Sequence, residues 1–224
     1  MTKSDDWYRS PGWTDADQEE FARRLRRARH HTRYQYRRIK SVALLSTNDR
    51  AKRTAAETLL GMNIASDEVP DFEKAWAHSL LAQSARTAGD RTKAERHFRA
   101  ALELAGPGGS GLNGEEEVEL AELLLAKNTP DATLEAKAWL ERRAEEMPLF
   151  LRSQFRLCSA MAEVLLRLNQ REVAGEWAER ALELSTATHS GLTNHPRLGL
   201  IEADPRTIQW LQSVAQTRIS SGFH

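Results

Sequence analysis

A pair of amphipathic helical segments, repeated along the chain with the same small and apolar positions, limits the possible folds more than any other feature. The clearest copy covers residues 75–107, AWAHSLLAQSARTAGDRTKAERHFRAALELAGP. In its second segment Ala94, Phe98 and Ala101 follow one another at spacings of four and three, which places them on one helical face. The small alanines on that face predict a close approach by another helix.

Further copies can be aligned on one small residue in each second helix. Ala56, Ala94, Ala136 and Ala174 are separated by 38, 42 and 38 residues. No stretch alternates apolar and polar residues as a strand does, so the sequence predicts an all-α fold. The first and last helices lie outside the repeats, as expected of caps that cover an apolar end face.

Helix boundaries are marked by residues that cap helices well. Thr14, Asp90 and Thr129 each precede a predicted helix, and Thr129 is followed by a proline at the first helical position. Further helices are expected from about Arg33, over about 50–61, from Pro70, after Glu115, over about 150–187 as a pair, and from Asp204. Asn169 and Glu172 resemble a capping box. The glycine-rich stretch 106–114 predicts a mobile loop.

Composition excludes several classes. The chain has 32 basic and 32 acidic residues, so it has no overall attraction to nucleic acid or membranes. The N-terminal sequence has no apolar run typical of a signal peptide, and no segment is apolar enough to span a membrane, so a cytoplasmic location and no membrane partner are expected. The single cysteine, Cys158, lies in an apolar stretch and is predicted to be a buried core residue.

Catalytic motifs are absent from the sequence. It has no HExxH, no CxxC, no glycine-rich phosphate loop and no nucleophile elbow. His30 and His31 are adjacent, so their rings diverge on a helix and do not share a metal ion. We therefore expect no catalytic residue, no metal site, no cofactor and no enzymatic activity.

The repeated segments resemble tetratricopeptide repeats. A wider resemblance to a group of bacterial proteins with such repeats rests on DDWYRSPGW, RRLRRARHHTRYQYRRIKSVALL, the 75–107 repeat and HPRLGLIEAD, and covers nearly the whole chain. It implies a right-handed superhelix of helical hairpins in a single domain, 1–224. Residues 1–31 would form the N-terminal cap, 32–187 about four helix pairs, and 188–224 a C-terminal segment with a capping helix.

The resemblance also implies a concave groove lined by the first helix of each pair. Transferred by register, the groove residues are Trp76, Ser79, Gln83, Arg86, Arg156, Ser159, Glu163 and Arg167. Arginines and a tryptophan there would suit an acidic peptide, because guanidinium groups form two-pronged ion pairs with carboxylates. The alternative is an ordinary solvated helix surface with Trp76 in the core.

A basic run is the second candidate site. Residues 21–40 contain nine arginine or lysine residues and no acid. The candidate basic patch comprises Arg23, Arg24, Arg26, Arg27, Arg33, Arg37 and Arg38. It could bind phosphates or an acidic protein, but a solvated or ion-paired surface is the alternative, because the run spans two helices.

The sequence therefore favours a non-enzymatic adaptor or scaffold that binds a protein or peptide. A nucleic-acid-associated regulator that uses the surface from Arg23 to Lys40 is the first alternative. A bacterial conflict component, such as an immunity or defence accessory protein, is the second. A homodimer formed through exposed end faces is compatible with each of these functions.

Overall fold

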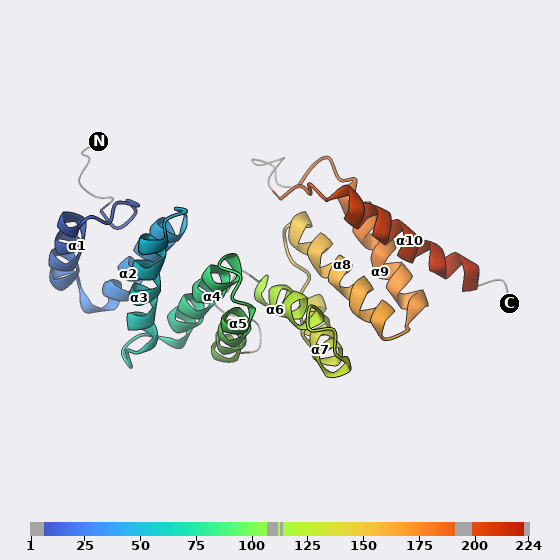
Figure 1. Ribbon diagram of the computed structural model, residues 1–224, viewed down its shortest axis with the longest axis horizontal. Helices are drawn as coiled ribbons and strands as arrows, with labels where there is room; N and C mark the ends of the chain where they lie inside the picture. Colours follow the sequence, from blue (N-terminus) through green and yellow to red (C-terminus); the bar gives the residue numbers. More distant parts are fainter. Residues whose placement is uncertain (1–6, 107–111, 113, 191–198, 222–224) are drawn as a thin grey trace. The chain divides into compact units, whose positions relative to one another are not determined.

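The computed structural model describes residues 7–106, 112, 114–190 and 199–221, the last four of these by their backbone alone. These residues form ten α-helices and no strand (Figure 1), which confirms the all-α prediction. The chain divides into two compact units, residues 1–113 and 114–224, and each is described by itself. The boundary falls in the glycine-rich stretch 106–114, most of which lies outside the described residues. A single domain over 1–224 stays a prediction.

Unit 1 contains five helices. They are α1 (Asp15–Arg27), α2 (His30–Leu45), α3 (Arg50–Ile64), α4 (Asp71–Thr87) and α5 (Arg91–Ala105). From α2 onward each helix packs against the next one in the chain, and α2 also contacts α4. The unit is thus a stack of neighbouring antiparallel helices (Figure 1).

Capping residues start α1 and α5 as predicted. Thr14 accepts a hydrogen bond from the backbone N–H of Asp17, whose carboxylate accepts one in return from the backbone N–H of Thr14. Asp90 accepts a 2.9 Å hydrogen bond from the backbone N–H of Lys93. Each bond satisfies a backbone donor that the first helical turn leaves unpaired. The second helix begins three residues before the predicted Arg33, at His30.

One core cluster of unit 1 joins its first three helices. Phe21, Leu44, Ala56 and Leu59 are buried together, and partly buried aromatic residues of the preceding segment, Trp7, Tyr8 and Trp13, pack against them. Burial of aromatic rings removes a large apolar area from water. The N-terminal segment is therefore part of the fold of unit 1.

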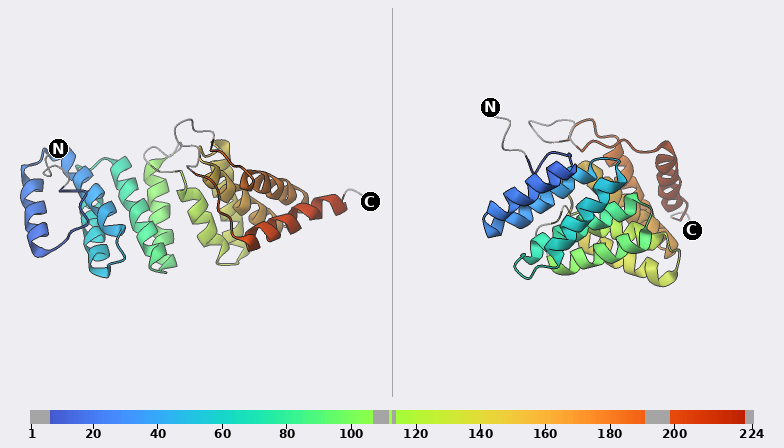
Figure 2. Two further views of the ribbon diagram at one scale, coloured as in Figure 1. Left: turned by 90° about the horizontal axis from the view of Figure 1, so that it is seen from above. Right: turned by 60° about the vertical axis from the view of Figure 1, so that its left-hand side comes forward.

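Unit 2 also contains five helices. They are α6 (Glu116–Leu125), α7 (Pro130–Glu145), α8 (Leu151–Arg167), α9 (Arg171–Ser185) and α10 (Pro205–Ser221). Each of the first four packs against its successor; α8 also contacts α6, and α10 packs against α9 and α8. Figure 2 shows α10 from two further directions. Residues 191–198, including the His195-Pro196 part of the HPRLGLIEAD segment, lie outside the described residues.

The alanines that define the register are all at helix contacts. Ala56, Ala94, Ala136 and Ala174 have an exposed fraction of 0%. Cys158 is also completely buried, which confirms its assignment to the core. The periodicity of the sequence therefore identifies the buried face of each second helix correctly.

One predicted cap is wrong. Asn169 does not cap α9, because its φ of 59° places it in the left-handed region, and the residue at the N-cap is Gln170 without a side-chain hydrogen bond. Asparagine tolerates the left-handed conformation better than most residues. Asn169 therefore makes the turn between α8 and α9.

Candidate functional site

The four groove residues predicted in unit 2 line one cavity. They lie on one face of α8, where successive residues are three, four and four positions apart: Arg156, Ser159, Glu163 and Arg167. The cavity in front of them measures about 590 Å³. Its other walls come from Glu122 of α6 and from Thr207 and Trp210 of α10.

Apolar side chains form much of the cavity lining. Phe155, Ala160 and Leu166 of α8 lie beside the partly buried ring of Trp210. A second cavity of about 480 Å³ shares Phe155, Arg156 and Thr207 with the first and extends along the segment before α10. We call the two together the unit 2 groove. The contribution of Trp210 was missed from the sequence, where the only signal was its position beside the apolar stripe of the last helix.

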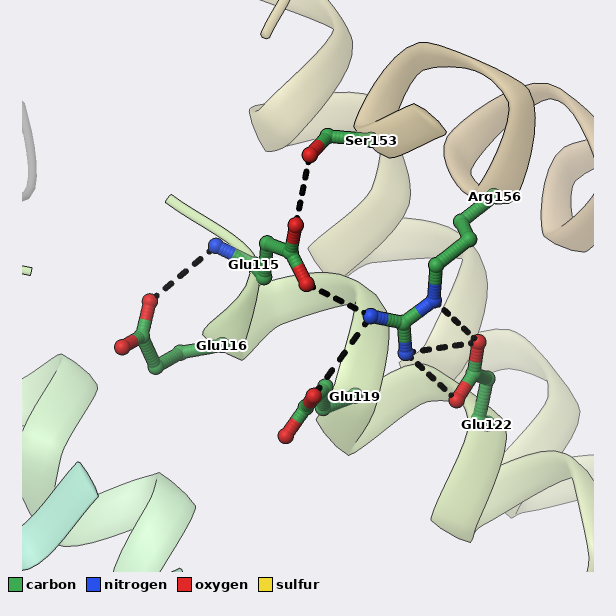
Figure 3. Close-up of polar contacts among 6 residues, drawn as sticks. All are labelled: Glu115, Glu116, Glu119, Glu122, Ser153 and Arg156. Carbon is green, nitrogen blue, oxygen red and sulfur yellow. Dashed lines mark hydrogen bonds and ion pairs between the residues drawn. The ribbon is translucent and has the colours of Figure 1, made fainter. Parts of the chain in front are cut away.

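Arg156 lies at the centre of a cluster of carboxylates (Figure 3). Its guanidinium group forms a two-pronged pair with Glu122, with Nη2–Oε2 at 2.9 Å and Nε–Oε1 at 3.2 Å. Nη1 pairs with Glu115 at 2.7 Å and with Glu119 at 3.4 Å. Ser153 donates a hydrogen bond to the second oxygen of Glu115 and holds it in place.

These carboxylates decide the charge state of Arg156. Burial alone would lower the pKa of Arg156, but attraction to Glu122 first, and then to Glu119 and Glu115, raises the pKa above its usual value. Three carboxylates therefore surround this one guanidinium group. Arg156 is therefore already engaged and does not offer a free positive charge to an acidic ligand.

Arg167 is held in a similar way at the other end of the predicted set. Its Nη1 donates to the backbone oxygen of Leu125 at 2.7 Å, and its Nη2 pairs with Glu163.

The buried Oγ of Ser159 has no hydrogen-bond partner among the described residues. A buried hydroxyl without a partner is uncommon, and here it lies in the wall of the cavity.

The four groove residues predicted in unit 1 do not converge in this way. Trp76 is partly buried beneath the guanidinium group of Arg38, which lies 5.2 Å from the ring centroid. Ser79 is completely buried, so its placement on a groove surface is corrected: this small side chain lies where α4 is packed. Gln83 lines a cavity of about 400 Å³ and Arg86 is exposed.

The predicted basic patch is divided among several local arrangements. Arg23 and Arg24 both pair with Glu20, whose pKa is lowered by their hydrogen bonds. Arg38 pairs with the buried carboxylate of Glu73 at 2.8 Å. Arg26 and Arg27 are exposed on α1. Two of the seven residues, Arg33 and Arg37, line a common cavity.

Comparisons with known protein families, with curated proteins and with solved structures found no match. Within the described ranges, no three histidine, cysteine, aspartate or glutamate side chains gather as metal ligands would. Among the helices that the structure describes, none is both long and apolar enough to cross a bilayer.

Proposed function

We propose that this protein is a non-enzymatic adaptor that binds a segment of another protein in the unit 2 groove. The observation that carries the proposal is the convergence of Arg156, Ser159, Glu163 and Arg167 with Trp210 on one cavity of about 590 Å³. A concave surface with an apolar floor and a few fixed polar groups is typical of a binding site. A cytoplasmic location belongs to the same proposal.

The helical hairpins support a tetratricopeptide-like arrangement, which is also part of the proposal. In unit 2 the pairs α6–α7 and α8–α9 each place a completely buried alanine, Ala136 or Ala174, at the second helix. Such small residues let helices of a repeat approach closely. Proteins built in this way bind partners on the surface of their first helices, which are α6 and α8 here.

The charge of the groove favours a basic segment over the acidic peptide expected from the sequence. The charged groups that line the unit 2 groove or pair with Arg156 comprise six carboxylates and three guanidinium groups: Glu115, Glu119, Glu122, Glu163, Glu202, Asp204, Arg152, Arg156 and Arg167. The excess negative charge attracts lysine or arginine side chains. An acidic ligand would instead displace carboxylates from their arginine partners.

The apolar lining determines the second feature of the ligand. Trp210 is partly exposed and faces the same cavity as Leu166, so it can cover a large apolar side chain or the methylene groups of a lysine. An aromatic ring beside carboxylates also suits a cation above its face. The ligand we propose therefore combines a basic residue with an apolar neighbour.

Selection from a phage-displayed library of random peptides tests this function. We expect peptides that bind the full protein to share basic and large apolar residues. Trp210→Ala should weaken their binding by about tenfold or more, since a buried aromatic anchor typically contributes at least 1–2 kcal/mol. Failure to enrich any sequence, or enrichment of acidic sequences, would overturn the proposal.

A matched pair of double variants separates the groove from general surface charge. Glu122→Gln with Glu163→Gln removes two carboxylates of the groove, whereas Glu172→Gln with Glu183→Gln removes two exposed ones from α9. The selected peptides should lose affinity for the first protein and keep it for the second. Equal losses would show attraction to the overall charge of the protein and contradict a defined site.

A further inference from the structure

Two arginines of unit 1 carry positive charges that none of its described carboxylates pairs with. Arg33 donates to the backbone oxygens of Ala28 at 3.2 Å and Arg26 at 3.0 Å. Arg37 donates from Nη1 to the side-chain oxygen of Asn63 at 3.3 Å. Both guanidinium groups are therefore positioned by neutral acceptors, and the carboxylate that lines the same cavity, Glu68, pairs with His30.

These arginines face one small cavity. Four residues of α2 share one helical face because they lie at spacings of three, one and three: His30, Arg33, Tyr34 and Arg37. With Met62 and the residues after α3 they enclose about 210 Å³. This volume holds a tetrahedral oxyanion together with a small organic group.

Arg37 is held in place from behind. Asn63 is completely buried, and its amide nitrogen donates to the backbone oxygen of Tyr34 at 3.0 Å while its oxygen accepts from Arg37. Nε of Arg37 is buried and has no partner among the described residues. Burial first, and then the neighbouring charge of Arg33, lowers the pKa of Arg37. A negative charge in the cavity would oppose this shift.

We propose that this cavity binds the phosphate group of a small phosphomonoester. A phosphate carries nearly two negative charges near neutral pH, whereas a carboxylate carries one. Two guanidinium groups therefore bind a phosphate better than a carboxylate. Tyr34 and Met62 provide an apolar wall for the organic part of the ligand. The site belongs to unit 1 alone and does not depend on the peptide site proposed in unit 2.

The exposed pair of Glu68 with His30 limits the cavity on one side. Their side chains lie 2.6 Å apart at Nε2–Oε2 and are 59% and 68% exposed, so the pair is weak and easily opened. Glu68 also lines the cavity, so its carboxylate repels a ligand with many phosphates more strongly than a single phosphate, and the cavity favours a small ligand over a nucleic-acid backbone.

Calorimetric titration of the full chain at constant ionic strength tests the proposal with three probes: inorganic phosphate, phenyl phosphate and acetate. We expect both phosphates to bind, phenyl phosphate more tightly because of Tyr34 and Met62, and acetate to bind at least about tenfold more weakly, which is about 1.4 kcal/mol. Tighter binding of inorganic phosphate would point to the free ion as the ligand and overturn the phosphomonoester. No heat from either phosphate, or equal binding of acetate, would overturn the site itself.

Variants locate the binding. Arg33→Gln and Arg37→Gln should each weaken phenyl phosphate binding by about tenfold or more, whereas Arg27→Gln, which removes the same charge from an exposed position on α1, should leave it within about twofold. Circular dichroism of each variant establishes that unit 1 is folded. If only the Arg33→Gln variant is folded, its affinity for phenyl phosphate decides whether the cavity is the binding site. An equal loss in Arg27→Gln, or tighter binding of a single-stranded oligonucleotide than of phenyl phosphate, would contradict a phosphate cavity.

Discussion

The ammonium group of Lys40 donates a 2.7 Å hydrogen bond to the backbone oxygen of Ser10, thirty residues earlier in the chain. A second bond of 2.9 Å reaches the backbone oxygen of Gly12. Lys40 is 2% exposed, and the ring of Trp13 lies 5.2 Å from its nitrogen. This buried cation therefore fastens the segment before α1 to α2.

Replacing Lys40 by methionine should destabilise unit 1. The substitution keeps the apolar stem but leaves two backbone oxygens without their charged donor, which costs about 2 kcal/mol or more in free energy of unfolding. Urea denaturation followed by circular dichroism measures the change. Lys74→Met, at a less buried lysine on α4, serves as the control and should change the free energy by less than about 0.5 kcal/mol.

Enlarging a register alanine should disturb helix packing. Ala174→Trp places a bulky ring where α9 has no exposed surface, and we expect a loss of about 1–3 kcal/mol with a melting temperature lower by several degrees. Val173→Trp introduces the same ring next to it at a position that is 42% exposed and should have little effect. Identical melting of Ala174→Trp and the unmodified protein would show that the register is wrong.

Local signals explain which parts of the fold were predictable. Thr14, Asp90 and Thr129 cap helices because their side chains reach backbone N–H groups three residues away. The buried alanines and the shared face of Arg156 and Arg167 follow from helical periodicity alone. In unit 2 the resemblance to tetratricopeptide repeats, transferred by register, named the four residues of α8 that line one wall of the groove.

Contacts between distant residues explain what was missed. Trp210 completes the groove only because α10 packs against α8 and α9, a contact that no local pattern encodes. The bond of Lys40 to Ser10 and the pair of Arg38 with Glu73 likewise join separate elements. The carboxylates of Glu115, Glu119 and Glu122 beside Arg156 are also distant from it in sequence, and because of them we propose a basic ligand where the sequence suggested an acidic one.

The imidazole rings of His78 and His97 should make unit 1 less stable in mild acid. Their Nδ1 atoms lie 2.9 Å apart. Burial first, and then the charges of His78, Arg96 and Lys93, lower the pKa of His97 from 6.5 to about 4, although Glu57 opposes the shift. Because the folded state favours neutral His97, its contribution to stability is complete above about pH 6.5 and is lost as the pH falls toward 4.

Comparing the pH dependence of stability of the unmodified protein with that of the His97→Gln variant measures the contribution of His97. Since His97 is partly exposed, solvent screening reduces the expected loss between about pH 7 and about pH 4.5 to about 1–2 kcal/mol. His97→Gln, which does not titrate, should lose less stability than the unmodified protein over the same interval in urea denaturation. Parallel pH profiles would contradict the assignment to this pair.

Cys158 should be inert to thiol reagents in the folded protein. Burial raises the pKa of its thiol to about 11, so little thiolate forms at about pH 8 and the sulfur is not accessible. Ellman's reagent should label it only at the rate of unfolding and rapidly in concentrated urea. A cysteine placed at exposed Thr186 is the positive control. Fast labelling of Cys158 in the native protein would show that unit 2 opens readily.

Hydrogen–deuterium exchange with and without a selected peptide tests most directly whether the unit 2 groove is the binding site. We expect slower exchange of backbone amides in α8, around residues 155–167, and in the first half of α10, around Trp210, because a ligand in the groove stabilises both walls. Exchange in α1–α3 should be unchanged. Protection confined to other helices, with α8 and α10 unaffected by a tightly bound peptide, would show that the peptide binds outside the unit 2 groove.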